Sequence, residues 1–276
     1  MQASPLPSLP GTAPAGSWKI TTADLDVGDG RLAIFPIVVR DTATSLRLLG
    51  TGFYLVTNGG FVTAAHVALE AQNCMAETPD SVGVVHTIFD GPSVFRPISK
   101  LFVHPTADVA FGVAHEMIDD KTGRAFRSKV LSLDTNCPEI GSSISTWSYP
   151  LHHVIGDNQS GRFLQLQPDF YDGTLQDIFT KTGPSGRLRP PYYLTSIHLY
   201  GGSSGGPVFN AAGCVFGIAS CSFEGAEDIA YVTPVSAILE IELQMTTVSD
   251  DHGSRPINAV KELAKLGALS LRSKTS

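Results

Sequence analysis

From about Leu32 onward, the chain is a succession of short β-branched and aromatic runs separated by glycine, asparagine, aspartate and proline. The first kind of residue favours strands and the second favours turns, so most of the chain is expected to be strand. Asn58-Gly59 is typical of a tight hairpin turn. The expected strands include Leu32–Val39, Gly52–Val56, Phe61–Ala64, Val82–Phe89, Val109–Val113, Ser143–Trp147, Phe163–Gln167, Pro207–Phe209, Cys214–Ser220 and Ile229–Val232. This pattern predicts an all-β sandwich or barrel.

Helical periodicity is confined to two segments near the carboxyl end. The first runs from Pro234 to about Met245, but Glu242 interrupts its apolar face and Ile241, Leu243 and Met245 alternate, which leaves a shorter helix open. The second is Ile257–Leu269, which is also amphipathic. The polar segment Ser249–Ser254 between them is expected to be a linker. Residues 1–30 contain four prolines among serine, alanine and glycine, which predicts a flexible Pro-rich leader. The main folded domain is therefore expected within residues 31–248.

The charge of the chain restricts its partners. Its 26 acidic and 19 basic residues give a formal net charge of −7, which argues against binding to nucleic acid or to an anionic membrane surface. No apolar run approaches the roughly 18 residues that a membrane-spanning helix needs. The start of the chain has no basic segment followed by an apolar block, so no secretory signal is predicted. A cytoplasmic location is expected, with secretion as the alternative if a signal peptide has been removed.

The four cysteines do not suggest a disulfide framework. Cys214 and Cys221 lie on one expected strand, roughly 23 Å apart at ~3.3 Å per residue, which is beyond disulfide reach. No pair that includes Cys74 or Cys137 has the spacing of a zinc site. We therefore expect four reduced and mostly buried thiols, no metal, no cofactor, and a reducing compartment.

The segment Gly201-Gly202-Ser203-Ser204-Gly205-Gly206-Pro207 has the composition of a nucleophile loop. Glycines allow the backbone to turn so that several amide N–H groups converge without side chains in the way. Converging N–H groups stabilise the oxyanion of a tetrahedral acyl intermediate. A simple glycine-rich hairpin turn has the same composition, so this segment alone leaves catalysis and a structural turn equally open.

Two further segments carry a histidine and an aspartate. Phe61–Val67 places His66 just after a strand and two small residues, and Pro105–Phe111 places Asp108 at the start of an apolar strand. Together with the serine segment, they resemble the His, Asp and Ser motifs of the chymotrypsin/trypsin serine protease superfamily, in the chain order of that family. The gaps of 42 residues to Asp108 and 96 residues to Ser204 suit two successive barrels.

The resemblance covers about residues 32–245 and is nearest to the bacterial and viral branches. Gly50–Leu55 is similar to their Gly-x-Gly-Phe strand, and Gly141–Pro150 is similar to the end of their Tyr-Pro strand. The resemblance implies two six-stranded antiparallel β-barrels of the chymotrypsin-like kind, with their boundary near 125–140. Residues 249–276 are then expected to be a linker and a short C-terminal helix.

The same resemblance implies a role for each matched residue. Ser204 Oγ would attack the scissile carbonyl, His66 would move the proton, and Asp108 would orient the imidazole. The N–H groups of Gly202 and Ser204 would form the oxyanion hole. Ser203 is the rival nucleophile, one residue out of register with the motif. The expected function is a serine endopeptidase that cleaves proteins or peptides through an acyl-enzyme.

Ser203 also marks a departure from part of the family. In members that are activated by cleavage, an aspartate precedes the nucleophile and pairs with a newly formed amino terminus. Here that position is the uncharged Ser203. We therefore expect an enzyme that folds in a competent state without proteolytic activation.

The specificity pocket is the least determined part of the expected site. The resemblance places its walls around His198, Leu199, Ala219, Ser220, Ser222 and Ala230. Tryptic enzymes have an aspartate six residues before the nucleophile, where this chain has His198, so a preference for Arg or Lys is not supported. The small residues Ala219 and Ala230 leave room for a medium-sized apolar side chain.

Two alternatives to a free-standing peptidase remain open. The chain could be a catalytically silent protease-like module that binds peptides, because a sequence does not show that triad residues meet in space. It could also be a protease domain under the control of a regulatory partner. Of the other histidines, His104 before Pro105 is assigned a structural role, and His152-His153 is expected to be a solvated pair.

Overall fold

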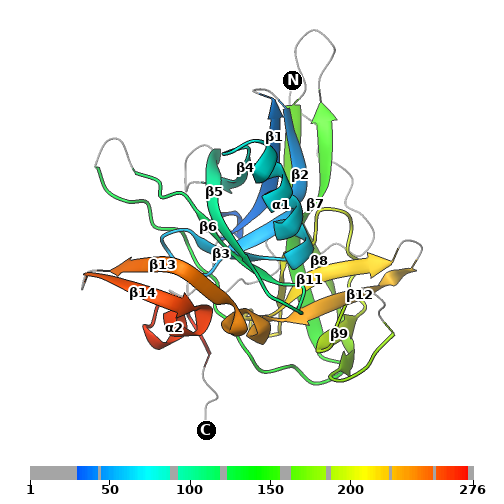
Figure 1. Cartoon of the computed structure of the whole chain (residues 1–276). Helices are drawn as coiled ribbons and strands as arrows, with labels where there is room; N and C mark the ends of the chain where they lie inside the picture. The colour runs from blue at the N-terminus through cyan, green and yellow to red at the C-terminus, as the bar shows by residue number, and fades with distance from the viewer. Residues whose placement is uncertain are drawn as a thin grey trace.

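The computed structural model describes residues 30–42, 45–87, 93–118, 123–155, 163–184, 188–223, 226–250 and 253–272. Within these ranges, the chain forms two closed antiparallel barrels of six strands each, placed side by side (Figure 1). The predicted fold class is therefore confirmed. The predicted leader, residues 1–30, lies outside the described residues except for Gly30.

The two barrels follow each other along the chain. The first has the strand order β1-β2-β3-β6-β5-β4, with β1 (Ile34–Thr42), β2 (Ser45–Tyr54), β3 (Gly60–Thr63), β4 (Val82–Thr87), β5 (Ser93–Val103) and β6 (Ala110–Ala114). The second has the order β10-β11-β12-β9-β8-β7, with β7 (Ser143–Ile155), β8 (Phe163–Phe179), β9 (Tyr192–Thr195), β10 (Pro207–Phe209), β11 (Val215–Phe223) and β12 (Ala226–Pro234).

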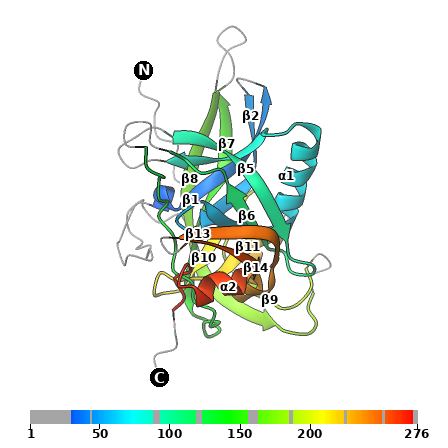
Figure 2. The same ribbon diagram turned by 60° about the vertical axis from the view of Figure 1, so that its left-hand side comes forward.

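Helices and a hairpin accompany the barrels. They are η1 (Gly30–Leu32), α1 (Ala65–Glu77), η2 (Val235–Glu240), β13 (Glu242–Asp250), β14 (Gly253–Ala259) and α2 (Val260–Lys265). Helix α1 packs against β2 and β5 and covers one side of the first barrel (Figure 2). Strands β13 and β14 form a separate two-stranded sheet, and α2 folds against β14 and η2 (Figure 1).

The barrels share one apolar core. Ile34 and Phe53 of the first barrel and Val215 and Ile218 of the second are fully buried in a single cluster. Burying each side chain of this size contributes roughly 1.5–3 kcal/mol. The two barrels are therefore packed on one continuous apolar core.

The C-terminal segment belongs to the same core. Val260 and Leu263 of α2 are buried in the cluster that joins the barrels. Leu133 N–H donates to Ser270 O at 2.8 Å, and the Leu133 carbonyl accepts from Arg272 N–H at 2.8 Å. The tail therefore docks on the protein. Among the described residues, no helix is both long and apolar enough to span a membrane.

The Asn58-Gly59 hairpin is formed as predicted. Gly59 has a φ of +106°, a conformation that glycine adopts without a steric cost. The carbonyl of Gly60 accepts the N–H groups of Leu55 and Val56 at 2.9 and 3.1 Å. This turn sends β3 directly into α1, the helix that carries His66.

The helices differ from the sequence expectations. Helix α1 is not predicted, because three of its four buried residues are alanine and the apolar stripe is weak. The helix expected over Pro234–Met245 is wrong beyond Glu240. Only a short 3-10 turn forms, and the buried Ile241 and Leu243 alternate with exposed neighbours as β13 begins.

The expected helix over Ile257–Leu269 is shorter than predicted. Its first three residues end strand β14, and Gly267, with a φ of +71°, follows the last helical turn. The expected linker Ser249–Ser254 is instead the end of a hairpin, because Asp250 pairs with Gly253. The four cysteines form no disulfide, but only Cys214 is buried, so the expectation of mostly buried thiols is wrong.

Candidate active site

The serine loop lies between β9 and β10 and is seated against the first barrel. Gly202 and Gly205 have φ angles of +92° and +88°, which glycine alone adopts easily. A side chain at Gly205 would collide with the Thr51 carbonyl and the Thr63 hydroxyl. The Thr51 N–H donates to the Ser204 carbonyl at 2.8 Å. The loop glycines therefore allow Ser204 to reach the boundary between the barrels.

His66 and Asp108 meet as the sequence analysis requires. His66 is the second residue of α1, and its backbone N–H donates to Asp108 Oδ1 at 3.1 Å. Its Nδ1 lies 3.0 Å from both Oδ1 and Oδ2 of the same carboxylate. A carboxylate cannot donate, so Nδ1 carries the proton and Nε2 is left as a free base site.

The environment keeps Asp108 ionised. Burial alone would raise the pKa of this carboxyl, but hydrogen bonds and charge from His66, with a further hydrogen bond from Ser220, hold its pKa below the ordinary value. Only 11% of the Asp108 side chain is exposed, whereas 51% of the His66 side chain is exposed. The His66 imidazole is therefore accessible, whereas the negative charge of Asp108 is shielded from solvent.

The hydroxyl of Ser204 is engaged elsewhere in this structure. Its Oγ donates to the Ser220 carbonyl at 3.0 Å. In the part of the chain that the structure describes, no hydrogen bond joins Ser204 to His66. Catalytic hydrogen bonds are often formed only when substrate is bound, so a bond between Ser204 and His66 would require this hydroxyl to leave the Ser220 carbonyl.

The proposed oxyanion donors are free and their loop is held. Among the described residues, the N–H groups of Gly202 and Ser204 have no hydrogen-bond acceptor. The Gly202 carbonyl accepts from Thr51 Oγ1 at 2.8 Å, and the same hydroxyl accepts from Tyr149 N–H at 3.0 Å. The Thr51 hydroxyl thus holds the peptide group between Gly202 and Ser203, next to the Gly202 N–H. Unpaired N–H groups in a fixed loop suit binding of a developing oxyanion.

Ser203 is not available as a nucleophile. It is fully buried, and its Oγ accepts a hydrogen bond from Ser148 Oγ at 3.0 Å. Its N–H donates to the Tyr200 carbonyl at 3.0 Å. Ser203 therefore shapes the turn, whereas Ser204 is only partly buried.

The predicted pocket residues are only partly brought to the site. Ser220 touches both Ser204 and Asp108, so its position is more central than a pocket wall. Ser222 Oγ donates to the Leu199 carbonyl at 2.7 Å, and the half-buried His198 packs on the Tyr200 ring. Leu199, Ala219 and Ala230 are buried in the core of the second barrel. Their role in specificity stays a prediction.

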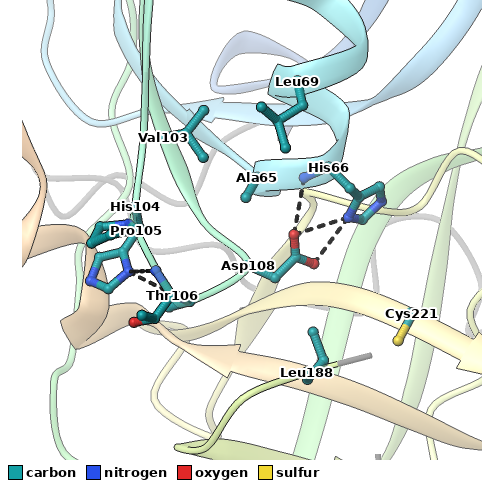
Figure 3. Close-up of a pocket in the computed structure, with 11 residues that line it drawn as sticks. Ala65, His66, Leu69, Val103, His104, Pro105, Thr106, Asp108, Leu188 and Cys221 are labelled. Carbon is teal, nitrogen blue, oxygen red and sulfur yellow. Dashed lines mark hydrogen bonds and ion pairs between the residues drawn. The ribbon is translucent and has the colours of Figure 1, made fainter. Parts of the chain in front are cut away.

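A cavity of about 710 Å³ opens beside His66 and Asp108. Figure 3 shows the pair with Leu69 on one side of the cavity and Leu188 and Cys221 on the other. The lining residues are Ala65, His66, Leu69, Val103, His104, Pro105, Thr106, Ala107, Asp108, Leu188 and Cys221. The walls are mostly apolar. No group of three or more His, Cys, Asp or Glu suited to a metal occurs among the described residues.

Sequence reasoning missed several residues that hold the site. Thr51, Thr63 and Ser148 are fully buried, and each hydroxyl makes a hydrogen bond that supports the serine loop or its neighbour. The Gly-Thr-Gly segment around Thr51 is a weak signal. Its partners lie 98 and 151 residues further along the chain, so the sequence alone does not indicate them.

Comparisons with known proteins agree with the fold. A family model described as a trypsin-like peptidase domain matches residues 50–218, which is more than half of the chain. The fold is similar to the active form of the Rv3671c protease from M. tuberculosis (TM-score 0.50, 15% identity, covering 75% of this chain and 78% of that one). It is also similar to Deg5 (TM-score 0.51, 18% identity, covering 76% and 87%). No curated protein matches the sequence. The chain therefore belongs to the trypsin-like peptidase family and is a serine protease.

Proposed function

We propose that the protein is a serine endopeptidase that hydrolyses peptide bonds through an acyl-enzyme, with Ser204 as nucleophile, His66 as general base and Asp108 as its orienting carboxylate. The observation that carries the proposal is the clamp on His66. Its Nδ1 lies 3.0 Å from both Asp108 oxygens, which leaves Nε2 as the basic nitrogen.

Catalysis begins when the Ser204 hydroxyl turns from the Ser220 carbonyl toward His66 Nε2. As Oγ forms a bond to the scissile carbonyl carbon, its proton passes to Nε2, and the ionised Asp108 stabilises the imidazolium. The C–N bond then breaks and Nε2 returns the proton to the leaving amine. Water attacks the ester in the same way, releasing the new carboxylic acid and restoring Ser204.

The charge that develops on the substrate oxygen is placed on the Gly202 and Ser204 N–H groups. These donors have no other acceptor among the described residues, so no existing hydrogen bond has to break before they bind the oxyanion. Losing one such donor typically costs ~10²–10³ in rate. Thr51, which holds the Gly202 carbonyl, contributes by keeping the loop in place.

A protein or peptide is the proposed substrate. On the side of β11 that pairs with β10, Ala219 is bonded to Gly205 and Gly206, and past Ala219 no described strand pairs with this edge. An extended peptide can add to such an edge through backbone hydrogen bonds. Ser220 lies on this stretch and touches Ser204, so a peptide bound there would run past the nucleophile.

A second candidate function is a peptide-binding module without catalysis. It is favoured by one observation, that Ser204 Oγ donates to Ser220 and not to His66. The two candidates differ in whether this hydroxyl reacts. A fluorophosphonate modifies only an activated serine, so it distinguishes them.

The test is labelling by a fluorophosphonate probe of wild type, Ser204→Ala, Ser203→Ala and His66→Ala. We expect rapid labelling of wild type and of any folded Ser203→Ala protein, and none for the other two variants. Circular dichroism shows whether each variant is folded. Persistent labelling of Ser204→Ala would refute the nucleophile, and an unlabelled, folded wild type would favour the binding module.

A further inference from the structure

His104 lies in the loop that carries Asp108 and is only 7% exposed. Its Nδ1 accepts two backbone hydrogen bonds, from Thr106 N–H at 3.1 Å and from Ala107 N–H at 2.8 Å (Figure 3). An imidazole nitrogen that accepts cannot also carry a proton. The ring is therefore neutral, with its proton on Nε2.

The loop around this ring is short and closed. It joins Val103 of β5 to Ala110 of β6, which face each other in the sheet. The His104 N–H donates to the Val109 carbonyl at 3.0 Å, and the Val109 N–H donates to the Ala107 carbonyl at 2.8 Å. The residues on both sides of Asp108 are therefore held. The Ala107 N–H bonds to the His104 ring, and the Val109 N–H bonds to the Ala107 carbonyl.

The backbone just before Asp108 is held through His104. Pro105 has no N–H to donate. The next two N–H groups, those of Thr106 and Ala107, both point at His104 Nδ1. One side-chain nitrogen therefore satisfies both backbone donors that immediately precede Asp108.

The opposite end of the ring makes no hydrogen bond. In the described part of the chain, the buried Nε2 has no hydrogen-bond partner, and the Glu240 carboxylate on η2 is 3.6 Å away, too far for one. The ring therefore makes its hydrogen bonds through Nδ1 alone. A substitution that keeps an acceptor at the Nδ1 position can thus be compared with one that only fills the space of the ring.

We propose that His104 is a positioning residue, whose Nδ1 fixes the backbone before Asp108 and so holds the carboxylate in line with His66 Nδ1. This inference rests on the proposed function, because it assigns a support to the proposed His66–Asp108 pair. The effect acts through geometry, and His104 itself does not touch the reacting atoms. A small displacement of a catalytic group costs up to about 10²-fold in rate.

Three substitutions separate the acceptor from the bulk of the ring. His104→Asn places an amide oxygen near the Nδ1 position, His104→Gln places its amide near Nε2, and His104→Leu retains size without an acceptor. We expect His104→Asn to keep kcat within about threefold of wild type. We expect the other two to lose kcat by about 10- to 100-fold with a smaller change in KM.

A second readout does not depend on peptide cleavage. In the Ser204→Ala background, the His66 Nδ1 proton held by Asp108 should give a far-downfield NMR resonance, assigned by its loss in His66→Gln. The signal should persist with His104→Asn and disappear or broaden with His104→Leu. A His104→Leu chain with normal kcat and resonance, or a His104→Asn chain as impaired as His104→Gln, would overturn the inference. If wild type cleaves nothing, the proposed function fails while the resonance still tests His104.

Discussion

Thr51 and Ser204 connect the two barrels at the catalytic cleft, because the Thr51 N–H donates to the Ser204 carbonyl at 2.8 Å. The Thr51 hydroxyl extends this connection by donating to the Gly202 carbonyl and accepting from the Tyr149 N–H. One side chain of the first barrel therefore sets the conformation of the nucleophile loop in the second.

Replacing Thr51 by valine should damage both stability and activity. The substitution keeps the shape of the side chain but leaves two polar groups, the part-buried Gly202 carbonyl and the buried Tyr149 N–H, without this partner. We expect the free energy of unfolding in urea to fall by about 1–3 kcal/mol. We expect kcat to fall at least tenfold, because the Gly202 N–H moves with its loop.

Thr51→Ser is the matched control, because it restores the hydroxyl and removes only a methyl group. It should recover most of kcat. Equal losses in the serine and valine variants would mean that packing of the methyl group, and not the hydrogen bonds, supports the loop.

The stability of the protein should fall in mild acid because of His86. This side chain is 1% exposed, and burial, with the nearby charge of Arg96, lowers the pKa of His86 to about 4. An imidazole in the unfolded chain titrates near ~6.5. Between these values the unfolded state binds a proton that the folded state excludes, so the free energy of unfolding decreases by roughly 3 kcal/mol as pH falls from about 6.5 to about 4.

Urea unfolding of Ser204→Ala at several pH values measures this slope without autolysis. His86→Phe removes the titrating group, although it also removes the contact of His86 Nδ1 with Tyr54 OH at 2.9 Å. That variant should be less stable at neutral pH and lose less stability on acidification. Parallel pH profiles for the two chains would show that other groups cause the acid sensitivity.

The cavity beside His66 should select an apolar side chain of the substrate. Leu69, Val103 and Leu188 contribute to its mostly apolar wall. A peptide-library digest should show enrichment of bulky apolar residues at one position near the scissile bond. Leu188→Glu should lower kcat/KM for such peptides by about tenfold, the scale of one misplaced group in a hydrophobic pocket. A flat library profile, or no effect of Leu188→Glu, would contradict this assignment.

Removal of residues 1–30 should not be needed for activity. Ser203 stands where cleavage-activated relatives need a charged partner for a new amino terminus, and here it is neutral, buried and bonded to Ser148 Oγ. The intact chain and a chain trimmed through residue 30 should react with a fluorophosphonate at the same rate. Reaction that strictly requires trimming would refute constitutive competence.

The sequence predicts those parts of the site that are local. His66, Asp108 and Ser204 each lie in a short segment whose composition and order indicate the family, and the barrels follow from that resemblance. Thr51 and Ser148 are different, because their partners come from distant strands that only the folded barrels bring together.

The C-terminal elements illustrate the same limit. Whether Ile241 and Leu243 belong to a helix or to a strand depends on packing against Val260 and Leu263, which lie beyond the hairpin. Their local pattern is compatible with either period over such a short run. Helix α1 escapes prediction because alanine packs well under a barrel but gives little periodic signal.

The central claim is that an acyl group is transferred to Ser204 by the His66–Asp108 pair. Its most direct test is to trap the acyl-enzyme with an activated ester at mildly acidic pH, where deacylation is slow, and to locate the acyl group by tandem mass spectrometry. We expect one acyl group, on Ser204, absent from His66→Ala. An acyl group on Ser203 or Cys221, or equal acylation of folded His66→Ala, would contradict it.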